Sequence, residues 1–324
     1  MSTVGGERAG ATSAPGRAAP RVSVVVPTYN HAAVLGRALA SVVAQTTGDW
    51  EAIVVNNHST DDTEAVVARI GDPRISLVRY ANHGVIAASR NEGIRRARGE
   101  YVAFLDSDDE WMPDKLAACL ALMADGVGLV GHGELWRDAA GRDRPMTYGP
   151  ATRTTYDALL YRGNCISTSA VVVRAAALRE VGGFDEDPAI VTTEDYDLWL
   201  RLARAGVGMA FTPRMLGVFH RHPGSASSAA DRHLRAELAV LARHFASPPA
   251  GAASVDAATR MRRRHRIARA HYGAGRQLRR EPAAALRAFA RAVAISPLTW
   301  RAYPAAAIAV GDAARRLVRP GAGS

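Results

Sequence analysis

Short apolar runs alternate with amphipathic stretches along the first third of the chain. A β-branched run from Val22 to Val26 stops at Pro27, a pattern typical of a strand buried on both faces of a parallel sheet. Similar strand-like runs and stretches with apolar residues at helical spacing follow: 50–55, 75–79 and 101–105 for the strands, 32–45 and 85–97 for the helices. Strands that alternate with helices predict βαβ units, and therefore an α/β fold whose sheet is covered by helices.

Polar residues follow three of these four predicted strands. They are Pro27 to Asn30 after the first strand, residues 56–62 after the second and residues 106–109 after the fourth. Ligands of such sheets bind at the carboxyl ends of the strands. We therefore expect these three segments to converge on one edge of the sheet.

Three carboxylates occur within four residues after the fourth strand, at Asp106, Asp108 and Asp109. Like charges packed together are costly without a cation, and hard oxygen ligands favour Mg²⁺ or Mn²⁺. Such an ion can neutralise a diphosphate. A solvated acidic turn would look the same, so this segment alone leaves both interpretations open.

Two further polar clusters carry candidate chemistry. Asp195 lies at the expected start of a helix, where a carboxylate fits either helix capping or a general base. His222 follows in a loop, where an imidazole fits either a cation or phosphate ligand or an ordinary polar surface. Trp136 and Tyr148 fit either stacking on a sugar ring or ordinary core and surface positions.

Charge and composition divide the chain. Residues 226–324 carry 18 basic and 5 acidic side chains, whereas residues 1–225 carry 23 and 26. The basic, Ala-rich and Arg-rich end predicts helices that face either an anionic membrane surface or solvent. Nucleic acid is not an expected partner, because the arginines at residues 262–269 lack interleaved aromatic side chains.

The spacing of small and apolar residues between Ala270 and Trp300 is helical and resembles one tetratricopeptide-type helix pair. This pattern favours an appendage that serves packing or oligomerisation.

The remaining composition bears on the location of the protein. Residues 1–20 are rich in Gly, Ala, Ser and Pro and lack an apolar core segment, so we expect a disordered leader and no signal peptide. The two cysteines belong to no cluster, which fits a reducing cytoplasm. No uninterrupted apolar stretch approaches the ~18 residues of a membrane-spanning helix. Residues 247–251 read as a linker between helices.

Six ordered motifs together resemble the inverting family 2 of glycosyltransferases. They are VSVVVPTYN at 22–30, EAIVVNNHSTDDT at 51–63, NHGVIAASRNEG with ARGEYVAFLDSDD at 82–109, VGGFDE at 181–186, EDYDLWLRL at 194–202 and RHPGS at 221–225. The resemblance implies the GT-A nucleotide-diphospho-sugar transferase fold, a mixed and mostly parallel sheet flanked by helices, over residues 21–228. A C-terminal α-helical appendage would occupy residues 229–324.

The resemblance also implies roles for the matching positions. Asp195 is expected to take the proton of the acceptor hydroxyl, and Asp108 with His222 to hold Mn²⁺ or Mg²⁺ on the diphosphate. The positions expected to bind the nucleotide part of the donor are Pro27, Tyr29, Asn57, Arg90 and Asp106. The implied substrates are a UDP-, dTDP- or GDP-sugar and an acceptor hydroxyl, lipid-linked as one option. The implied setting is the synthesis of a cell-surface polysaccharide, a glycolipid or another glycoconjugate in the cytoplasm, with peripheral contact at the inner face of the plasma membrane as one option.

One loop departs from the family pattern. Where the family has Asp-Asp-Gly-Ser, this chain has Asn56, Asn57, His58 and Ser59. The amide oxygen of Asn57 can still accept a hydrogen bond from the N3–H of a nucleobase, but without charge assistance. His58 replaces a glycine that tolerates positive φ, a region that histidine also enters.

This departure leaves a second interpretation open, a catalytically weak or silent nucleotide-sugar-binding or scaffold module of the same fold. The acidic residues retained elsewhere favour the enzyme. A nucleotidyltransferase would need a Gly-rich phosphate loop followed by Lys or Arg, and residues 27–36 offer none.

Overall fold

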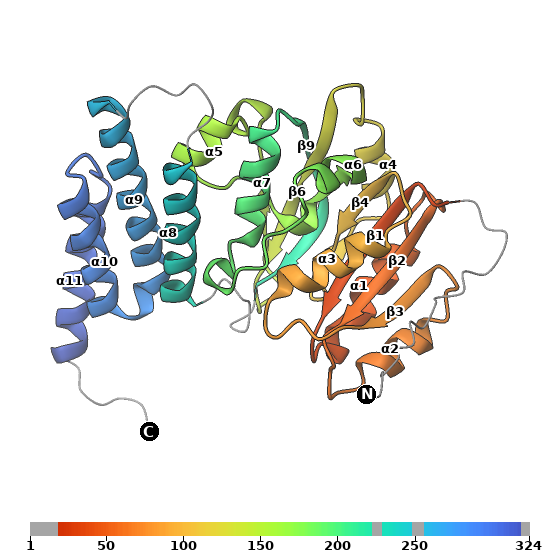
Figure 1. Ribbon diagram of the computed structural model, residues 1–324. Helices are drawn as coiled ribbons and strands as arrows, with labels where there is room; N and C mark the ends of the chain where they lie inside the picture. Colours follow the sequence, from red (N-terminus) through yellow and green to blue (C-terminus); the bar gives the residue numbers. More distant parts are fainter. Residues whose placement is uncertain (1–18, 222–228, 248–255, 319–324) are drawn as a thin grey trace, which may run out of the picture.

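The computed structural model describes residues 19–221, 229–247 and 256–318 of the chain. Within these ranges, nine strands form one mixed sheet in the order β3-β2-β1-β4-β8-β6-β9-β5, with β7 paired to β6. Helices cover both faces of the sheet, and a separate group of helices lies beside it (Figure 1). The predicted leader at 1–20, the linker at 247–251 and His222 lie wholly or mostly outside the described residues.

The parallel half of the sheet has the four strands that the sequence predicts. They are β1 (Val22–Thr28), β2 (Trp50–Asn56), β3 (Ile75–Arg79) and β4 (Tyr101–Phe104). β1 lies between β2 and β4 and is buried along its whole length, as its β-branched run predicts. Because all four strands run in the same direction, their carboxyl ends lie at one edge.

The two faces of the sheet have different helical cover. α1 (Ala32–Val43), α2 (Thr63–Ile70) and α4 (Lys115–Leu120) contribute to the core on one face. α3 (Ile86–Arg96), α6 (Ala175–Glu180) and α7 (Glu194–Arg204) contribute to the core on the other. α3 approaches β1 so closely at Gly93 that an added Cβ would lie 2.3 Å from a methyl carbon of Val25. A glycine is therefore required where this helix crosses the strand.

The second half of the sheet is largely antiparallel. Its strands are β5 (Glu110–Trp111), β6 (Val127–Arg137), β7 (Asp143–Met146), β8 (Val171–Arg174) and β9 (Gly208–His220). β8 joins the parallel half through antiparallel pairing with β4, and β6 follows antiparallel to β8. α5 (Tyr156–Arg162) and short 3₁₀ turns at Ala151–Arg153, Thr168–Ala170 and Pro188–Ile190 connect these strands.

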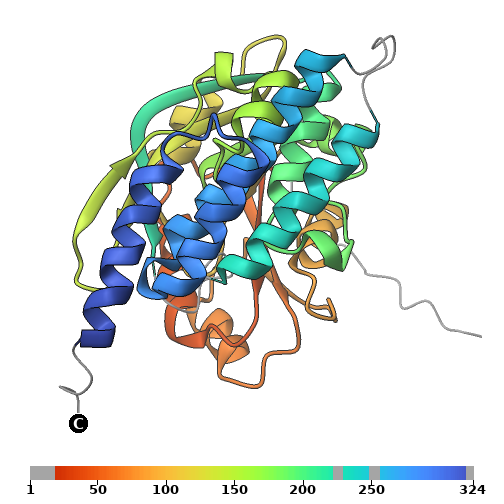
Figure 2. The ribbon, with the colours of Figure 1, turned by 90° about the vertical axis from the view of Figure 1, so that its left-hand side faces the viewer.

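Beyond the sheet, the chain continues as α8 (Ala230–Ala246), α9 (Ala257–Gln277), the 3₁₀ turn Leu278–Arg280, α10 (Pro282–Ile295) and α11 (Ala302–Val318). α8 packs on the sheet and its helices through Val240 and Leu241, whereas α9, α10 and α11 share a small core around Phe289. Figure 2 shows these helices lying side by side along one flank. The C-terminal helices are therefore as predicted, and α8 joins them to the sheet.

Part of the basic C-terminal charge is used in packing. Arg262 pairs with Asp157 of α5 at 2.6 Å. Arg266 is 3% exposed, pairs with Glu237 of α8 at 2.5 Å and donates to the carbonyl oxygen of Leu160 at 3.0 Å. Across the described ranges, no helix has both the length and the apolarity needed to cross a membrane.

Candidate active site

A cavity of about 460 Å³ opens at the carboxyl ends of the parallel strands. All the predicted site residues that the structure describes line it: Pro27, Tyr29, Asn57, Arg90, Asp106, Asp108 and Asp195. The expected convergence of the strand ends on one site is therefore observed. His222 is outside the described residues, so its place in the site stays a prediction.

Arg90 connects the two acidic clusters of the cavity. Its side chain is 4% exposed and lies 2.7 Å from Asp106 and 2.6 Å from Glu194. Burial alone would lower the pKa of Arg90, but the adjacent carboxylates raise it above the ordinary arginine value. The guanidinium thus stays charged and fixes the loop after β4 to the first turn of α7. Arg90 and Glu194 are 104 positions apart in the sequence.

Asp195 lies in the first turn of α7, beside the cavity. Its Oδ2 accepts from Asn164 Nδ2 at 3.3 Å and from Thr168 Oγ1 at 3.4 Å, and its Oδ1 accepts from the N–H of Tyr196. Burial, followed by the Glu194 charge, raises the pKa of Asp195 to about 7. A carboxylate with a pKa near neutrality is suited to accept a proton. The helix-start position allows capping as well, so both interpretations of Asp195 are compatible.

The three clustered aspartates of the loop after β4 separate into two environments. Asp106 and Asp108 line the cavity, whereas Asp109 is 1% exposed. Asp109 accepts from Ser169 Oγ at 2.6 Å and from the N–H of His220 at 3.2 Å. Burial and the neighbouring carboxylates, Glu134 first, raise the pKa of Asp109 well above its ordinary value. Asp109 is therefore a structural acid inside the sheet.

The cavity suits a divalent cation that arrives with a diphosphate. Its described lining includes the carboxylates of Asp106, Asp108, Glu194 and Asp195 against two arginines, Arg90 and Arg232. A diphosphate would add negative charge there, so a cation is needed for it to bind. Within the part of the chain that the structure describes, no three His, Cys, Asp or Glu side chains are grouped as metal ligands. Mg²⁺ is usually bound through one or two protein carboxylates together with phosphate oxygens and water.

The part of the cavity where the nucleotide is expected contains the unusual loop. His58 has φ 51°, which confirms that a residue other than glycine takes up positive φ there. The Oδ1 atom of Asn57 accepts from the N–H of Asn82 at 2.9 Å, so this oxygen is already engaged in the protein. The amide therefore retains its Nδ2 donor and one lone pair of Oδ1 for further hydrogen bonds. Tyr29 is 53% exposed beside these residues, with a ring face accessible for stacking.

Several lining residues were absent from the sequence prediction. His31 contacts Ser107 through Nδ1 at 2.7 Å, and Asn82, Thr168, Thr192 and Phe219 also line the cavity. Asn82 follows β3. The expectation that ligands bind at the carboxyl ends of the strands, which identified the other segments, would therefore have identified Asn82 as well. Thr168 and Thr192 come from turns whose approach depends on tertiary packing, and no local sequence pattern indicates them.

Trp136 and Tyr148 belong to a partly buried hydrogen-bond network that ends on the buried carboxyl group of Glu134. Trp136 Nε1 donates to Tyr148 Oη at 3.0 Å, and that hydroxyl donates to Glu134 at 2.7 Å. Burial raises the pKa of Glu134 to about 7. Trp136 packs against Phe219, which lines the cavity, at a ring separation of 5.3 Å. This arrangement favours the core interpretation of both aromatic residues.

Comparison with known proteins agrees with this geometry. The model of glycosyl transferase family 2 matches residues 23–182. TuaG of Bacillus subtilis, whose name assigns it to teichuronic acid biosynthesis, is 33% identical over 192 residues, which cover 58% of this chain and 73% of TuaG. The UDP-Glc:alpha-D-GlcNAc-diphosphoundecaprenol beta-1,3-glucosyltransferase WfgD of Escherichia coli is 30% identical, covering 56% of this chain and 70% of WfgD.

A solved structure shares the fold. The mannosyltransferase PcManGT of Pyrobaculum calidifontis, in complex with GDP-Man and Mn²⁺, superposes with a TM-score of 0.58. The two sequences are 23% identical, and the match covers 93% of this chain and 81% of PcManGT. The predicted GT-A fold is therefore confirmed. By its motifs, its fold and its relatives, this chain belongs to glycosyl transferase family 2 and is a glycosyltransferase.

Proposed function

We propose that the protein is a metal-dependent inverting glycosyltransferase. It moves a sugar from a nucleotide-diphosphate sugar to an acceptor hydroxyl, in the synthesis of a cell-surface polysaccharide or glycolipid. The observation that carries the proposal is the meeting of Asp106, Asp108 and Asp195 in one cavity, joined through the two ion pairs of Arg90. A general base, an expected cation ligand and an expected nucleotide contact are thereby within one site.

The reaction is a single displacement. Asp195 takes the proton from the acceptor hydroxyl, whose oxygen attacks the anomeric carbon from the face opposite the diphosphate. The new carbon–oxygen bond forms as the bond to the diphosphate breaks, and the configuration at that carbon inverts. A divalent cation held by Asp108 and His222 would neutralise charge on the departing diphosphate. General-base assistance of this kind contributes typically ~10²–10⁴-fold to the rate.

Positioning comes from the residues around the base. Asn164 and Thr168 donate to the same oxygen of Asp195, so they orient the carboxylate toward the cavity. Arg90 holds Asp106 and the start of α7 in one arrangement. Because these contacts are already formed before the reaction, the site does not have to rearrange while the reaction proceeds.

The names of similar proteins support the substrate class. WfgD is named for a UDP-glucose donor and a diphosphoundecaprenol acceptor, and PcManGT was solved with GDP-Man and Mn²⁺. We propose a UDP-, dTDP- or GDP-sugar as donor and a lipid-linked hydroxyl as acceptor. The basic charge of the C-terminal helices supports peripheral contact with an anionic membrane at its cytoplasmic face. Equal co-sedimentation with neutral and anionic liposomes would contradict that contact.

A catalytically silent nucleotide-sugar-binding module remains the second candidate. The observation that favours it is Asn57, whose oxygen is engaged by Asn82 at the position where the family has an acid. Asp108 and Asp195 favour the enzyme, because a binding module needs no base.

Donor hydrolysis with Mn²⁺ across UDP-, dTDP- and GDP-sugars distinguishes the two candidates. We expect hydrolysis of one nucleotide class that stops when the metal is chelated, and an inverted anomeric centre in the transfer product by NMR. Donor binding with no turnover would favour the silent module, and a retained configuration would exclude the single displacement.

A further inference from the structure

A second cavity, of about 610 Å³, lies among the C-terminal helices, apart from the active-site cavity. Its walls come from α8, α9, the segment before α11 and the end of α5. Five arginines and one glutamate are among the described residues that line it, and four of the five guanidiniums, all but that of Arg162, are directed toward it. Such an excess of positive charge in a concave site needs either internal counter-charges or an anionic ligand.

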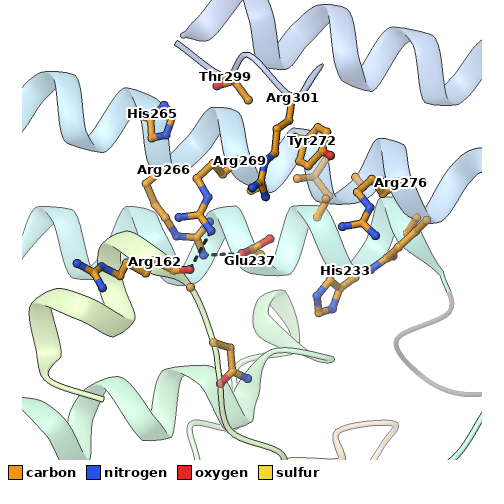
Figure 3. A pocket seen from close by; sticks show the side chains of 18 of the residues that line it. Arg162, His233, Glu237, His265, Arg266, Arg269, Tyr272, Arg276, Thr299 and Arg301 are labelled. Atoms are coloured by element: carbon orange, nitrogen blue, oxygen red, sulfur yellow. Dashed lines mark hydrogen bonds and ion pairs between the residues drawn. The ribbon is translucent and has the colours of Figure 1, made fainter. Parts of the chain in front are cut away.

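The arginines of this cavity have different surroundings. Arg266 is buried and paired with Glu237, so its charge is compensated within the protein. Arg269, Arg276 and Arg301 have no carboxylate partner among the described residues, and Figure 3 shows all three directed into the same space. Burial and then the charges of neighbouring arginines lower the pKa of Arg269. Arg269 donates only to the carbonyl oxygen of Arg162, at 3.2 Å, within the described ranges. These three guanidiniums are the cationic lining that an anion would neutralise.

The cationic cavity is adjacent to the proposed active site. Asn164 lines it and donates to Asp195 Oδ2 at 3.3 Å. His233 also lines it, and its Nδ1 lies 3.2 Å from Oγ1 of Thr192, which lines the active-site cavity. On α8, Arg232 lines the active-site cavity and the next residue lines the cationic one. At these points, a single pair of side chains separates the two cavities.

Exposed apolar side chains lie at the same cavity. Trp300 is 66% exposed and Leu298 is 62% exposed, and both are among its lining residues. Guanidinium groups bind phosphate oxygens in bidentate fashion, and an indole offers an apolar face beside them. This combination fits a phosphate or diphosphate that is joined to a less polar group.

We infer that the cationic cavity binds a phosphate or diphosphate group of the acceptor, and so holds the acceptor hydroxyl against Asp195. Only one part of this inference rests on the proposed function, namely the assignment of the anion to the acceptor. The anion site itself depends on Arg269, Arg276 and Arg301. The C-terminal helices would then be a substrate-binding part of the enzyme.

The first test is calorimetry of the full chain with inorganic pyrophosphate in the absence of divalent cations. Without a metal, the carboxylates of the active-site cavity repel the anion, so binding reports on the cationic cavity. We expect Arg269→Gln combined with Arg301→Gln to weaken pyrophosphate binding by about tenfold or more. Arg162→Gln is the matched control, because Figure 3 shows its guanidinium pointing away from the cavity. Unchanged affinity in the double variant, or an equal loss in the control, would overturn the inference.

The second test separates lipid-linked from soluble sources. A polyprenyl diphosphate carried in neutral vesicles is compared with pyrophosphate, and both are expected to bind less well to the double variant. A greater loss for the vesicles supports a lipid-linked acceptor, and a greater loss for pyrophosphate supports a soluble phosphorylated one. Metal-dependent donor hydrolysis should be the same in the double variant and the unaltered chain. If the unaltered chain hydrolyses no donor but still binds pyrophosphate through these arginines, the proposed function fails and the anion site stands.

Discussion

Arg90 lies 2.7 Å from Asp106, and the side chain of this arginine is only 4% exposed. The same guanidinium contacts Glu194 at 2.6 Å, beside the proposed base. One buried cation therefore connects the segment expected to bind the nucleotide with the segment expected to bind the acceptor. Replacement of Arg90 should therefore lower both the stability of the fold and the catalytic activity.

Arg90→Met should destabilise the protein by about 3 kcal/mol, because it leaves the buried Glu194 and the partly buried Asp106 without their shared cation. Arg95→Met is the control on the same helix. Its ion pair with Glu92 involves an arginine side chain that is 53% exposed, so its loss should cost less than about 1 kcal/mol. Urea unfolding of both variants measures the difference. Equal losses would contradict a central role for Arg90.

Asp195→Asn should lower the rate of transfer by ~10²–10⁴-fold while donor affinity stays the same, because an amide cannot accept the proton. Steady-state kinetics and donor calorimetry on the folded variant provide the measurement. A variant that keeps wild-type turnover would remove Asp195 from the role of base.

The pH dependence gives an independent test of the same residue. The pKa of Asp195 is raised to about 7, and only the deprotonated carboxylate acts as a base, so kcat/KM should rise with pH through that region.

The effect of the raised pKa of Asp195 on stability has the opposite sign. A carboxyl whose pKa is higher in the folded than in the unfolded state stabilises the fold at acid pH, and this contribution is lost as pH rises toward 7. Asp195→Asn should therefore raise the thermal midpoint at pH 8 relative to the unaltered chain. A lower midpoint there would contradict the shifted pKa.

Asp108→Ala should abolish metal-dependent donor binding in calorimetry, because Asp108 is the carboxylate expected to hold the cation in the cavity. Asp109→Asn is a close control. Burial raises the pKa of Asp109 well above its ordinary value, so an amide resembles its protonated form and metal dependence should persist. Donor binding that is unchanged by Asp108→Ala would remove this residue from the metal site.

Local patterns predicted the parts of the site that follow strands. The short apolar runs located β1, β2, β3 and β4, and the polar residues after them identified Asp106 and Asp108 on the cavity wall. The pairing of Arg90 with Glu194 could not be predicted, because the two residues are 104 positions apart and no periodicity relates them. The cationic cavity was missed for a similar reason. Its arginines look like an ordinary solvated helix face until α8, α9 and the segment before α11 are packed together.

The engaged oxygen of Asn57 leads to a prediction about the nucleobase. Oδ1 of Asn57 accepts from the N–H of Asn82, so a second donor such as a uracil N3–H would have to share this uncharged oxygen. The N3 atom of cytosine is an acceptor and can instead face the Nδ2 donor. In Asn57→Asp, one oxygen would keep the bond to Asn82 and the other would become a charged acceptor for the base. UDP should therefore bind about tenfold more tightly to this variant, because charge-assisted hydrogen bonds are the stronger ones.

Calorimetry of UDP and CDP against both proteins measures that effect. CDP is the internal control, because cytosine offers no hydrogen at N3 and should gain nothing from the new carboxylate. If both nucleotides change equally, the effect comes from the loop backbone around His58, and Asn57 does not contact the base. A selective gain for UDP would show that this position reads the edge of the base and that its amide departs from the family pattern in a way that alters donor choice.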